Sequence, residues 1–240
     1  MWRRDKTGTV VSPADVVTQA PLSGDTLSVP AAGSSGPIIK AEKVAFGYTQ
    51  DKLVLRDISF EVSAGEVLMI LGSNGCGKST LMRLLLNDKQ TAGGRILLDG
   101  TELRELSPLE ISRRVAMVFQ DHNAPFPYDV IDVVAMGRTP YLSAFATPRA
   151  RDMRICEDAL ESVGMMHLAH KPYTQISGGE RQMVLIARAL AQETPLIMMD
   201  EPTSHLDYRN AAIVIQTANR LASEQNKAVV MVTHLPDQAF

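Results

Sequence analysis

The segment Gly72-Ser73-Asn74-Gly75-Cys76-Gly77-Lys78-Ser79 decides the fold, because it follows the apolar run Val67–Leu71 and precedes a helical pattern that begins at Lys78. A glycine, four further residues, and then Gly-Lys-Ser have the spacing of a phosphate-binding loop. Glycines let backbone N–H groups turn inward around an anion, and the helix N-terminus adds positive potential. Lys78 supplies a charge for the terminal phosphates, and the Ser79 hydroxyl can bind magnesium. The residues expected to contact a nucleotide here are Gly72, Ser73, Asn74, Gly75, Cys76, Gly77, Lys78, Ser79 and Thr80.

Outward from this loop, short apolar strands alternate with helical patterns. The expected strands are 38–45, 58–62, Val67–Leu71, 95–98, 115–119, 196–199 and Ala228–Thr233, and the expected helices are 78–86, 180–192 and Tyr208–Ser223. Turn residues at 46–48 and 64–65 separate the first strands. Apolar strands that alternate with helices indicate a parallel sheet covered on both faces. The sequence therefore predicts an α/β core.

Two regions interrupt this pattern. Between residues 121 and 173 the strand signal is absent, and helical periodicity at 130–137 and 149–163 predicts an inserted helical lobe. Residues 1–37 are rich in Ser, Gly, Pro, Thr and Ala, so they have too little apolar surface to offset the entropy of ordering. We expect a disordered extension at 1–37 and one domain at 38–240, with a helical subdomain at about 121–176.

Net charge, the length of the apolar runs and the number of cysteines exclude several classes of protein. The chain has 240 residues, 45% of them hydrophobic, and a net charge of -3, so no long-range field favours nucleic acid. No apolar run reaches the roughly 20 residues of a membrane-spanning helix, and the N-terminus lacks the apolar core of a signal peptide. The two cysteines, Cys76 and Cys156, are too few for a disulfide framework. We therefore expect a cytoplasmic protein.

Two carboxylates follow the apolar strand 196–199. Asp200 and Glu201 come directly after it, and Pro202 ends the strand. Ligands of open parallel sheets bind outside the carboxyl ends of the strands, where the phosphate-binding loop also lies. Asp200 is therefore expected to hold magnesium, and Glu201 to polarise the water that attacks the terminal phosphate.

A second glycine-rich helix start occurs at Ser177-Gly178-Gly179-Glu180. Ser177 and Glu180 have the spacing of a capping box, which is a purely structural explanation. That explanation does not account for Gly178 and Gly179, since each glycine lowers helix propensity by up to about 1 kcal/mol relative to Ala. Exposed backbone N–H groups at a helix start suit a phosphate, so we expect a second anion site formed by Ser177, Gly178, Gly179 and Glu180.

Together these motifs resemble those of the ABC ATPase family over residues 38–240. Ile176 to Glu180 is similar to the family signature, with Ile and Glu in place of the commoner Leu and Gln. Other positions follow in the family order. Tyr48 resembles the aromatic residue that stacks on adenine, Gln120 the Q-loop glutamine, residues 204–207 the D-loop and His234 the switch histidine.

The resemblance implies a P-loop NTPase core of the RecA-like type, with an antiparallel β subdomain and an inserted helical subdomain. It implies ATP and Mg²⁺ as cofactors, with Glu201, His234 and Gln120 in catalysis and Ser79, Gln120 and Asp200 at the metal. In this family the phosphate loop and the signature of one domain face different partners, so two domains enclose two ATP molecules. A homodimer or a paired nucleotide-binding domain is therefore expected.

The segment 128–141 resembles the lobe of importer ATPases for ferric siderophores, haem and cobalamin. Permease subunits and an extracytoplasmic binding protein would then be partners, and the chain would lie on the inner face of the membrane. Molybdate, manganese and zinc importers have similar lobes and remain open. Two further alternatives are a soluble ABC ATPase that acts on macromolecules and a nucleotide-binding regulator without hydrolysis; Glu201 and His234 argue against the regulator. Relatives continue well beyond His234, so we expect a domain that is shortened at its C-terminus.

Overall fold

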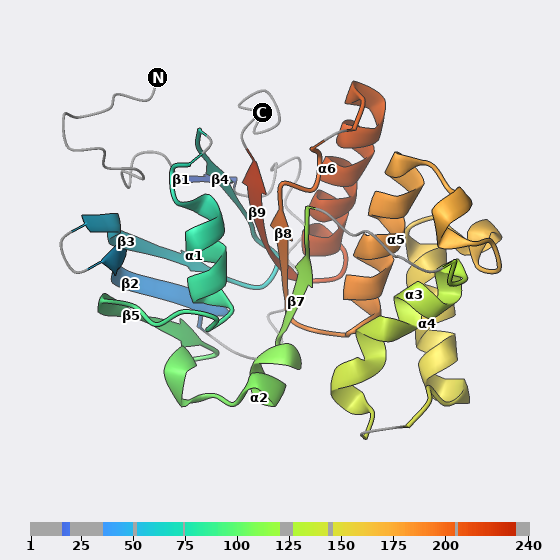
Figure 1. Cartoon of the computed structure of the whole chain (residues 1–240), viewed down its shortest axis with the longest axis horizontal. Coiled ribbons are helices and arrows are strands. Elements are labelled where there is room, and N and C mark those ends of the chain that lie inside the picture. The colour runs from blue at the N-terminus through green and yellow to red at the C-terminus, as the bar shows by residue number, and fades with distance from the viewer. Residues whose placement is uncertain are drawn as a thin grey trace, which may run out of the picture.

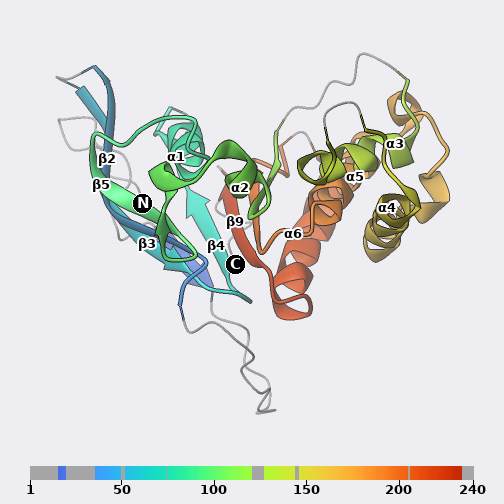
Figure 2. The ribbon, with the colours of Figure 1, turned by 90° about the horizontal axis from the view of Figure 1, so that it is seen from below.

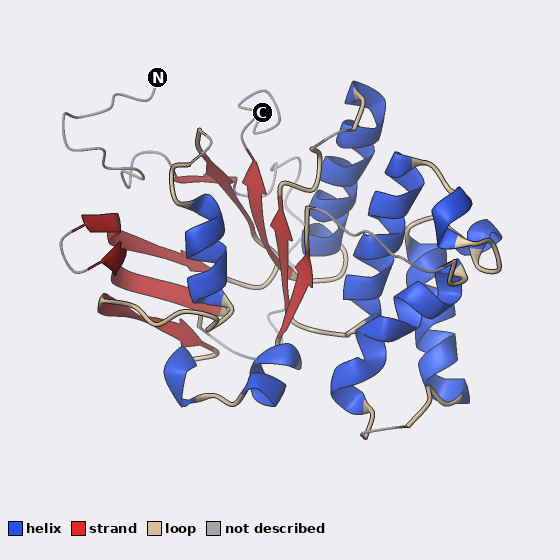
Figure 3. Cartoon of the chain, viewed as in Figure 1, coloured by secondary structure: helices blue, strands red, loops and turns tan. Residues whose placement is uncertain are grey.

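Two β-sheets with one helix between them carry the phosphate-binding loop (Figure 1). The computed structural model describes residues 16–19, 36–49, 52–73, 75–120, 127–143, 146–204 and 206–233. Helices cover the outer face of one sheet, and a separate group of helices lies beyond them (Figures 1 and 3). Among the described helices, none combines the length and the apolar character needed to cross a bilayer.

The first sheet is mainly parallel and has the order β1-β4-β9-β8-β7. Its parallel members are β4, β9, β8 and β7, which pair in register from Leu71 opposite Thr233 to Val118 opposite Met199. The carboxyl ends of these strands therefore meet at one edge, as the sequence predicts. The bounds are β4 Val67–Leu71, β7 Val115–Val118, β8 Leu196–Asp200 and β9 Ala228–Thr233.

The fifth strand of this sheet corrects the expectation for the N-terminus. Val16–Gln19 form β1, which pairs antiparallel with β4, so the prediction of disorder is wrong for these four residues. The prediction rested on side-chain composition. The edge of β4, however, presents backbone N–H and C=O groups, with which an extended segment of almost any composition can pair. Residues 1–15 and 20–35 lie outside the described part of the chain.

The second sheet is antiparallel and has the order β3-β2-β5-β6. The prediction of a turn at 46–48 is wrong, because β2 continues through these residues with several register shifts against β3. At Gly47 an added Cβ would lie 2.5 Å from the Lys52 carbonyl, so glycine is what lets the two strands approach there. The bounds are β2 Ile39–Thr49, β3 Lys52–Val62, β5 Gly93–Leu98 and β6 Thr101–Glu102.

Alternation along the parallel strands divides the core in two. In β4, Leu68 and Ile70 pack with the antiparallel sheet and with α1 (Lys78–Leu85), whereas Val67 and Met69 face the opposite side of the sheet. Helices α5 (Gly178–Ala191) and α6 (Tyr208–Ser223) cover that opposite side (Figure 2). Because every second residue points to one face, continuous apolar strands supply both cores.

The inserted lobe packs on α5. Its elements are α3 Val130–Ala135, η3 Met136–Tyr141, α4 Ala150–Ser162, η4 Met166–Leu168 and η5 Tyr173–Gln175. Two short helices, η2 Leu103–Glu105 and α2 Pro108–Ser112, precede β7 and were not expected. Arg138 of η3 is buried; it pairs with Asp152 at 3.1 Å and with Glu193 at 2.7 Å, and it donates to the Ala191 carbonyl over 2.7 Å. These contacts fix the lobe to the end of α5.

Candidate functional site

The phosphate-binding loop joins β4 to α1, as expected. Gly75 and Gly77 have φ values of +78° and +103°, a left-handed region that glycine adopts at low cost. A Cβ at Gly77 would lie 2.9 Å from Leu55 Cδ2, so the loop also packs closely on β3. Cys76 is buried, and its Sγ occupies the space where a Cβ on Gly72 would lie. Cys76 is absent from the wall of the cavity described next.

A cavity of about 450 Å³ lies over this loop. Lys78 is only 5% exposed, and its Nζ donates to the carbonyls of Gly72 over 2.7 Å and Ser73 over 3.2 Å. The ammonium is therefore held at the loop by its own backbone. The residues that line the cavity are Tyr48, Val54, Gly75, Gly77, Lys78, Ser79, Thr80, Gln120 and Glu201.

The two carboxylates at the end of β8 differ in their surroundings. Asp200 Oδ1 is buried and has no hydrogen-bond partner among the described residues. Burial raises the pKa of the Asp200 carboxyl, and the charge of Glu201 raises it further, while Lys78 opposes the shift. Glu201 lines the cavity, has a φ of +46°, and places Oε1 3.5 Å from Lys78 Nζ. Its Oε2 accepts a hydrogen bond from Ser204 Oγ over 3.0 Å.

Tyr48 stands at the mouth of the cavity with 60% of its surface exposed. Its hydroxyl lies 3.0 Å from Thr80 Oγ1, and its ring meets Phe46 edge to face at 5.1 Å. Lys89 Nζ lies 5.3 Å from the ring centroid. The ring is therefore positioned on two sides, and an exposed aromatic surface remains for a planar base.

The second glycine-rich segment opens α5 at a different place. Ser177 caps the helix, and its N–H donates to Glu180 Oε2 over 2.7 Å, so the capping box is present. Hydrogen bonds from the backbone and the hydroxyl of Ser177 lower the pKa of the Glu180 carboxyl. Ser177 and Gly178 are exposed and do not line the cavity over the loop. One chain therefore carries two separate glycine-rich helix starts.

Eight of the expected site residues line the cavity, whereas Gly72, Ser73, Cys76, Asp200 and residues 177–180 do not. Gln120 follows β7 and lines the cavity beside Glu201, whereas Asn74, His205 and His234 lie outside the described residues. Val54 in the cavity wall and Asn210 on α6 were not among the expected residues, and Ser204, expected only as part of the D-loop, donates to Glu201. Nothing in a single sequence singles out Val54 or Asn210, because both depend on which strands and helices become neighbours.

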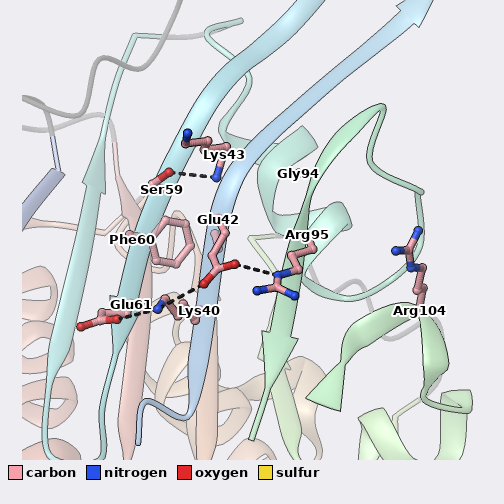
Figure 4. Close-up of a pocket in the computed structure, with 10 residues that line it drawn as sticks. Lys40, Glu42, Lys43, Ser59, Phe60, Glu61, Gly94, Arg95 and Arg104 are labelled. Atoms are coloured by element: carbon pink, nitrogen blue, oxygen red, sulfur yellow. Dashed lines mark hydrogen bonds and ion pairs between the residues drawn. The ribbon is translucent and has the colours of Figure 1, made fainter. Parts of the chain in front are cut away.

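A larger hollow, of about 760 Å³, lies on the antiparallel sheet away from the phosphate loop (Figure 4). Charged side chains line it, but they pair with one another. Lys40 lies 3.2 Å from Glu42 and 3.7 Å from Glu61, and Arg95 lies 2.7 Å from Glu42. The chemistry of phosphate binding is concentrated in the smaller cavity, which we take as the candidate site.

The family model for the ABC transporter matches residues 55–204, which include the phosphate loop, both carboxylates and the start of α5. The chain belongs to the ABC transporter family. This domain binds and hydrolyses ATP, so the chain is an ATPase. The family assignment confirms the predicted P-loop core with its antiparallel sheet and helical insertion.

Several relatives of this ABC protein are import subunits. The molybdate import ATP-binding protein of Haemophilus influenzae is 38% identical over 83% of this chain and 74% of its own length. The hemin import ATP-binding protein of Nocardia farcinica is 36% identical over 96% of this chain and 77% of its own. Among solved structures, a metal-chelate type ABC transporter in an inward-facing conformation has 37% identity and a TM-score of 0.75, with 85% of this chain and 75% of that one covered. A dimeric bacterial ABC transporter cassette has 27% identity and a TM-score of 0.69, with 84% and 90% covered.

Proposed function

We propose that this chain is the ATP-hydrolysing subunit of an importer for a metal chelate such as a ferric siderophore, haem or cobalamin. The observation that carries the proposal is a cavity lined by Lys78, Ser79 and Glu201 in a chain whose relatives include a hemin import subunit and a metal-chelate type transporter. The expected partners are a permease dimer, an extracytoplasmic binding protein and a second copy of the chain. The subunit would lie at the inner face of the cell membrane.

ATP would enter with its base against Tyr48 and its phosphates over the loop. The exposed Tyr48 ring lines the cavity together with Gly75, Gly77 and Lys78 of the loop. The proposed nucleotide contacts in this chain are Tyr48, Gly72, Ser73, Asn74, Gly75, Cys76, Gly77, Lys78, Ser79 and Thr80.

The residues present fit Mg²⁺. Asp200 Oδ1 is a buried carboxylate oxygen without a hydrogen-bond partner among the described residues, and Mg²⁺ prefers such oxygens. Ser79, Asp200 and Gln120 would hold the ion together with the phosphates. When bound, Mg²⁺ would offset the negative charge of the phosphates.

Glu201 is the proposed base. Its carboxylate faces the cavity, and Ser204 and Lys78 fix its two oxygens. A terminal phosphate would compete with Glu201 for Lys78, which would leave Glu201 free to accept a proton from the attacking water. Gln120 and His234 are proposed to orient that water and the phosphate.

The second anion site is proposed to act in a partner. Ser177, Gly178, Gly179 and Glu180 lie at the start of α5, outside the cavity that the phosphate loop lines. Backbone N–H groups at a helix start stabilise phosphate, so two chains placed head to tail would complete two ATP sites. The dimeric cassette with a similar fold supports this arrangement.

Purification with its membrane partners tests the proposal. We expect the chain to be retained with permease subunits and, in proteoliposomes, to hydrolyse ATP faster when a chelate-loaded binding protein is added. Stimulation only by a molybdate-loaded binding protein would mean that the imported substrate is an oxyanion and not a metal chelate, as the name of the molybdate import relative suggests. Retention with soluble macromolecular complexes, and not with permease, would favour the alternative of a non-transport ABC ATPase.

A further inference from the structure

The side chain of Asn210 lies against Gly179, although the two residues belong to different helices. A Cβ atom added to Gly179 would lie 2.7 Å from Asn210 Cγ, 2.8 Å from Oδ1 and 3.0 Å from Nδ2. The carboxamide therefore occupies the space that any side chain at position 179 would need. The starts of α5 and α6 are in direct contact at this point.

Asp207 holds the Asn210 side chain in this position. Asn210 Nδ2 donates to Asp207 Oδ2 over 3.0 Å, and the Asn210 backbone N–H donates to Oδ1 over 2.8 Å. Asp207 is also the N-cap of α6. The position of the carboxamide therefore follows the position of the segment that leads into the helix.

That segment begins at Glu201. The Ser204 hydroxyl donates to the Glu201 carboxylate, and the Ser204 N–H donates to the Glu201 carbonyl, each over 3.0 Å. The Leu206 N–H donates to the Thr203 carbonyl over 3.2 Å, so hydrogen bonds between described residues lead from the segment after Glu201 to Leu206, the residue before Asp207. The contacts of Asn210 continue this connection to Gly179, next to the exposed helix start.

We propose that Asn210 is a positioning residue for ATP hydrolysis, because it ties the start of α5 to the segment that follows Glu201. This inference rests on the proposed function, in which Glu201 acts on the chain's own ATP and the start of α5 acts on the ATP of a second copy. When Glu201 moves in response to the ATP of its own chain, this tie shifts the start of α5, which binds the ATP of the second copy. Asn210 thereby couples the two ATP sites.

The first test measures dimer formation without turnover. In the Glu201→Gln background, ATP and Mg²⁺ should drive dimers, and Asn210→Ala should raise the ATP concentration needed by about tenfold or more, since a misplaced helix start binds phosphate poorly. ATP affinity of the monomer should stay within about twofold. Asn219→Ala, on the exposed face of the same helix, is the matched control and should change neither quantity.

The second test measures coupling in the otherwise native chain. Asn210→Ala should lower kcat and reduce the Hill coefficient for ATP towards 1, an effect that loss of helix packing alone does not produce. Gly179→Ala should be much less harmful in the Asn210→Ala background than alone, because the vacated space accepts the new Cβ. Asn210→Ser, which keeps a polar residue in the first turn of α6, serves if Asn210→Ala does not fold.

The possible outcomes distinguish an error in the proposed composite site from an error in the role assigned to Asn210. If Glu201→Gln alone binds ATP but forms no dimer, the proposed composite site is wrong. If it forms dimers and the added Asn210 substitution leaves their ATP dependence and the Hill coefficient unchanged, the composite site stands and the role of Asn210 is overturned. Equal effects of Gly179→Ala in both backgrounds would also contradict that role.

Discussion

Lys78 Nζ lies 3.5 Å from Glu201 Oε1, so the cation of the phosphate loop and the proposed base form an ion pair. Both side chains are largely removed from solvent, with 5% and 15% of their surfaces exposed. A triphosphate brings more negative charge than one carboxylate, so it would take over the ammonium. Binding of ATP would thereby release Glu201 at the place where the water must be activated.

Replacement of Lys78 by Ala should abolish ATP binding at working concentrations, with Kd raised by about 100-fold or more, because the charge of the enclosed phosphates is left without its closest cation. Calorimetric titration measures this directly. Lys89→Ala is a matched control, because this ammonium faces the Tyr48 ring and does not line the cavity, and it should change Kd by about threefold or less. Near-normal affinity of Lys78→Ala would remove Lys78 from the phosphate site.

Asp200→Asn should stabilise the free protein and weaken its use of Mg²⁺. The pKa of Asp200 is raised in the folded state, chiefly by burial, so the folded state binds this proton more tightly than the unfolded state does. The contribution is fully present below the ordinary carboxyl pKa of 3.8 and is lost as the pH rises through the raised value. At neutral pH the native carboxylate is therefore a cost to stability that the amide avoids.

Denaturation of both proteins over a pH series checks this sign. The free energy of unfolding of Asp200→Asn minus that of the wild type should increase as the pH rises above 3.8, and should level off at higher pH. Addition of ATP with Mg²⁺ should raise the melting temperature of the wild type more than that of the variant. A variant that is less stable at every pH would mean that Asp200 has a structural role.

Much of this fold could be predicted because each local signal agreed with the global arrangement. Val67–Leu71 is apolar at every position and is followed by a glycine loop and a helix. This combination is typical of a strand in a parallel sheet that is covered on both faces. The prediction failed at 46–48, where Gly47 marks a register shift within a strand and not its end. Local composition cannot separate a bulge from a turn, since both favour glycine.

Contacts between distant segments could not be predicted. Arg138 was recognised only as part of a lobe-like stretch, whereas the structure pairs it with Asp152 and Glu193 and places it 4.3 Å from the Tyr141 ring. Asp152 lies on α4 and Glu193 follows α5, so each becomes a neighbour of Arg138 only when the chain folds. The convergence of Tyr48, Gln120 and Glu201 could be anticipated only through the order of family motifs.

Arg138→Met should lower the melting temperature by roughly 5 °C or more, because the methionine keeps the apolar stem and leaves the Ala191 carbonyl and Asp152 Oδ1 without this donor. Arg138→Lys should recover only part of the loss, since an ammonium lacks the planar fork of donors. Thermal melts measure both variants. ATP affinity should be nearly unchanged, because Arg138 does not line the cavity over the phosphate loop. A large loss would point to coupling through α5.

Removal of residues 1–35 should leave ATPase activity within about twofold of the full chain, because none of the described site residues belongs to this segment. The removal takes β1 from the edge of β4, so the truncated protein should melt earlier and aggregate more readily. Light scattering and a parallel ATPase assay check the two effects. A several-fold loss of activity at temperatures where the protein stays folded would show that the segment has a catalytic role.

Glu201→Gln tests the chemistry and the assembly together, because the amide keeps the size of the side chain and loses its basicity. Turnover should fall by about 10²–10⁴-fold, the range typical of a missing general base. ATP affinity should survive, since Lys78, Ser79 and Asp200 remain. The loss of the ion pair with Lys78 should even favour phosphate binding in the free chain.

The assembly is read by size-exclusion chromatography with ATP and Mg²⁺. The variant should move from monomer to dimer, whereas the wild type should not accumulate dimer, because hydrolysis removes the phosphate that joins the two halves. ADP in place of ATP is the control and should leave the variant monomeric. Wild-type turnover in Glu201→Gln would eliminate this residue as the base. An inactive variant that binds ATP and stays monomeric would separate the two ideas: the base would stand, and the composite site between two chains would have to be abandoned.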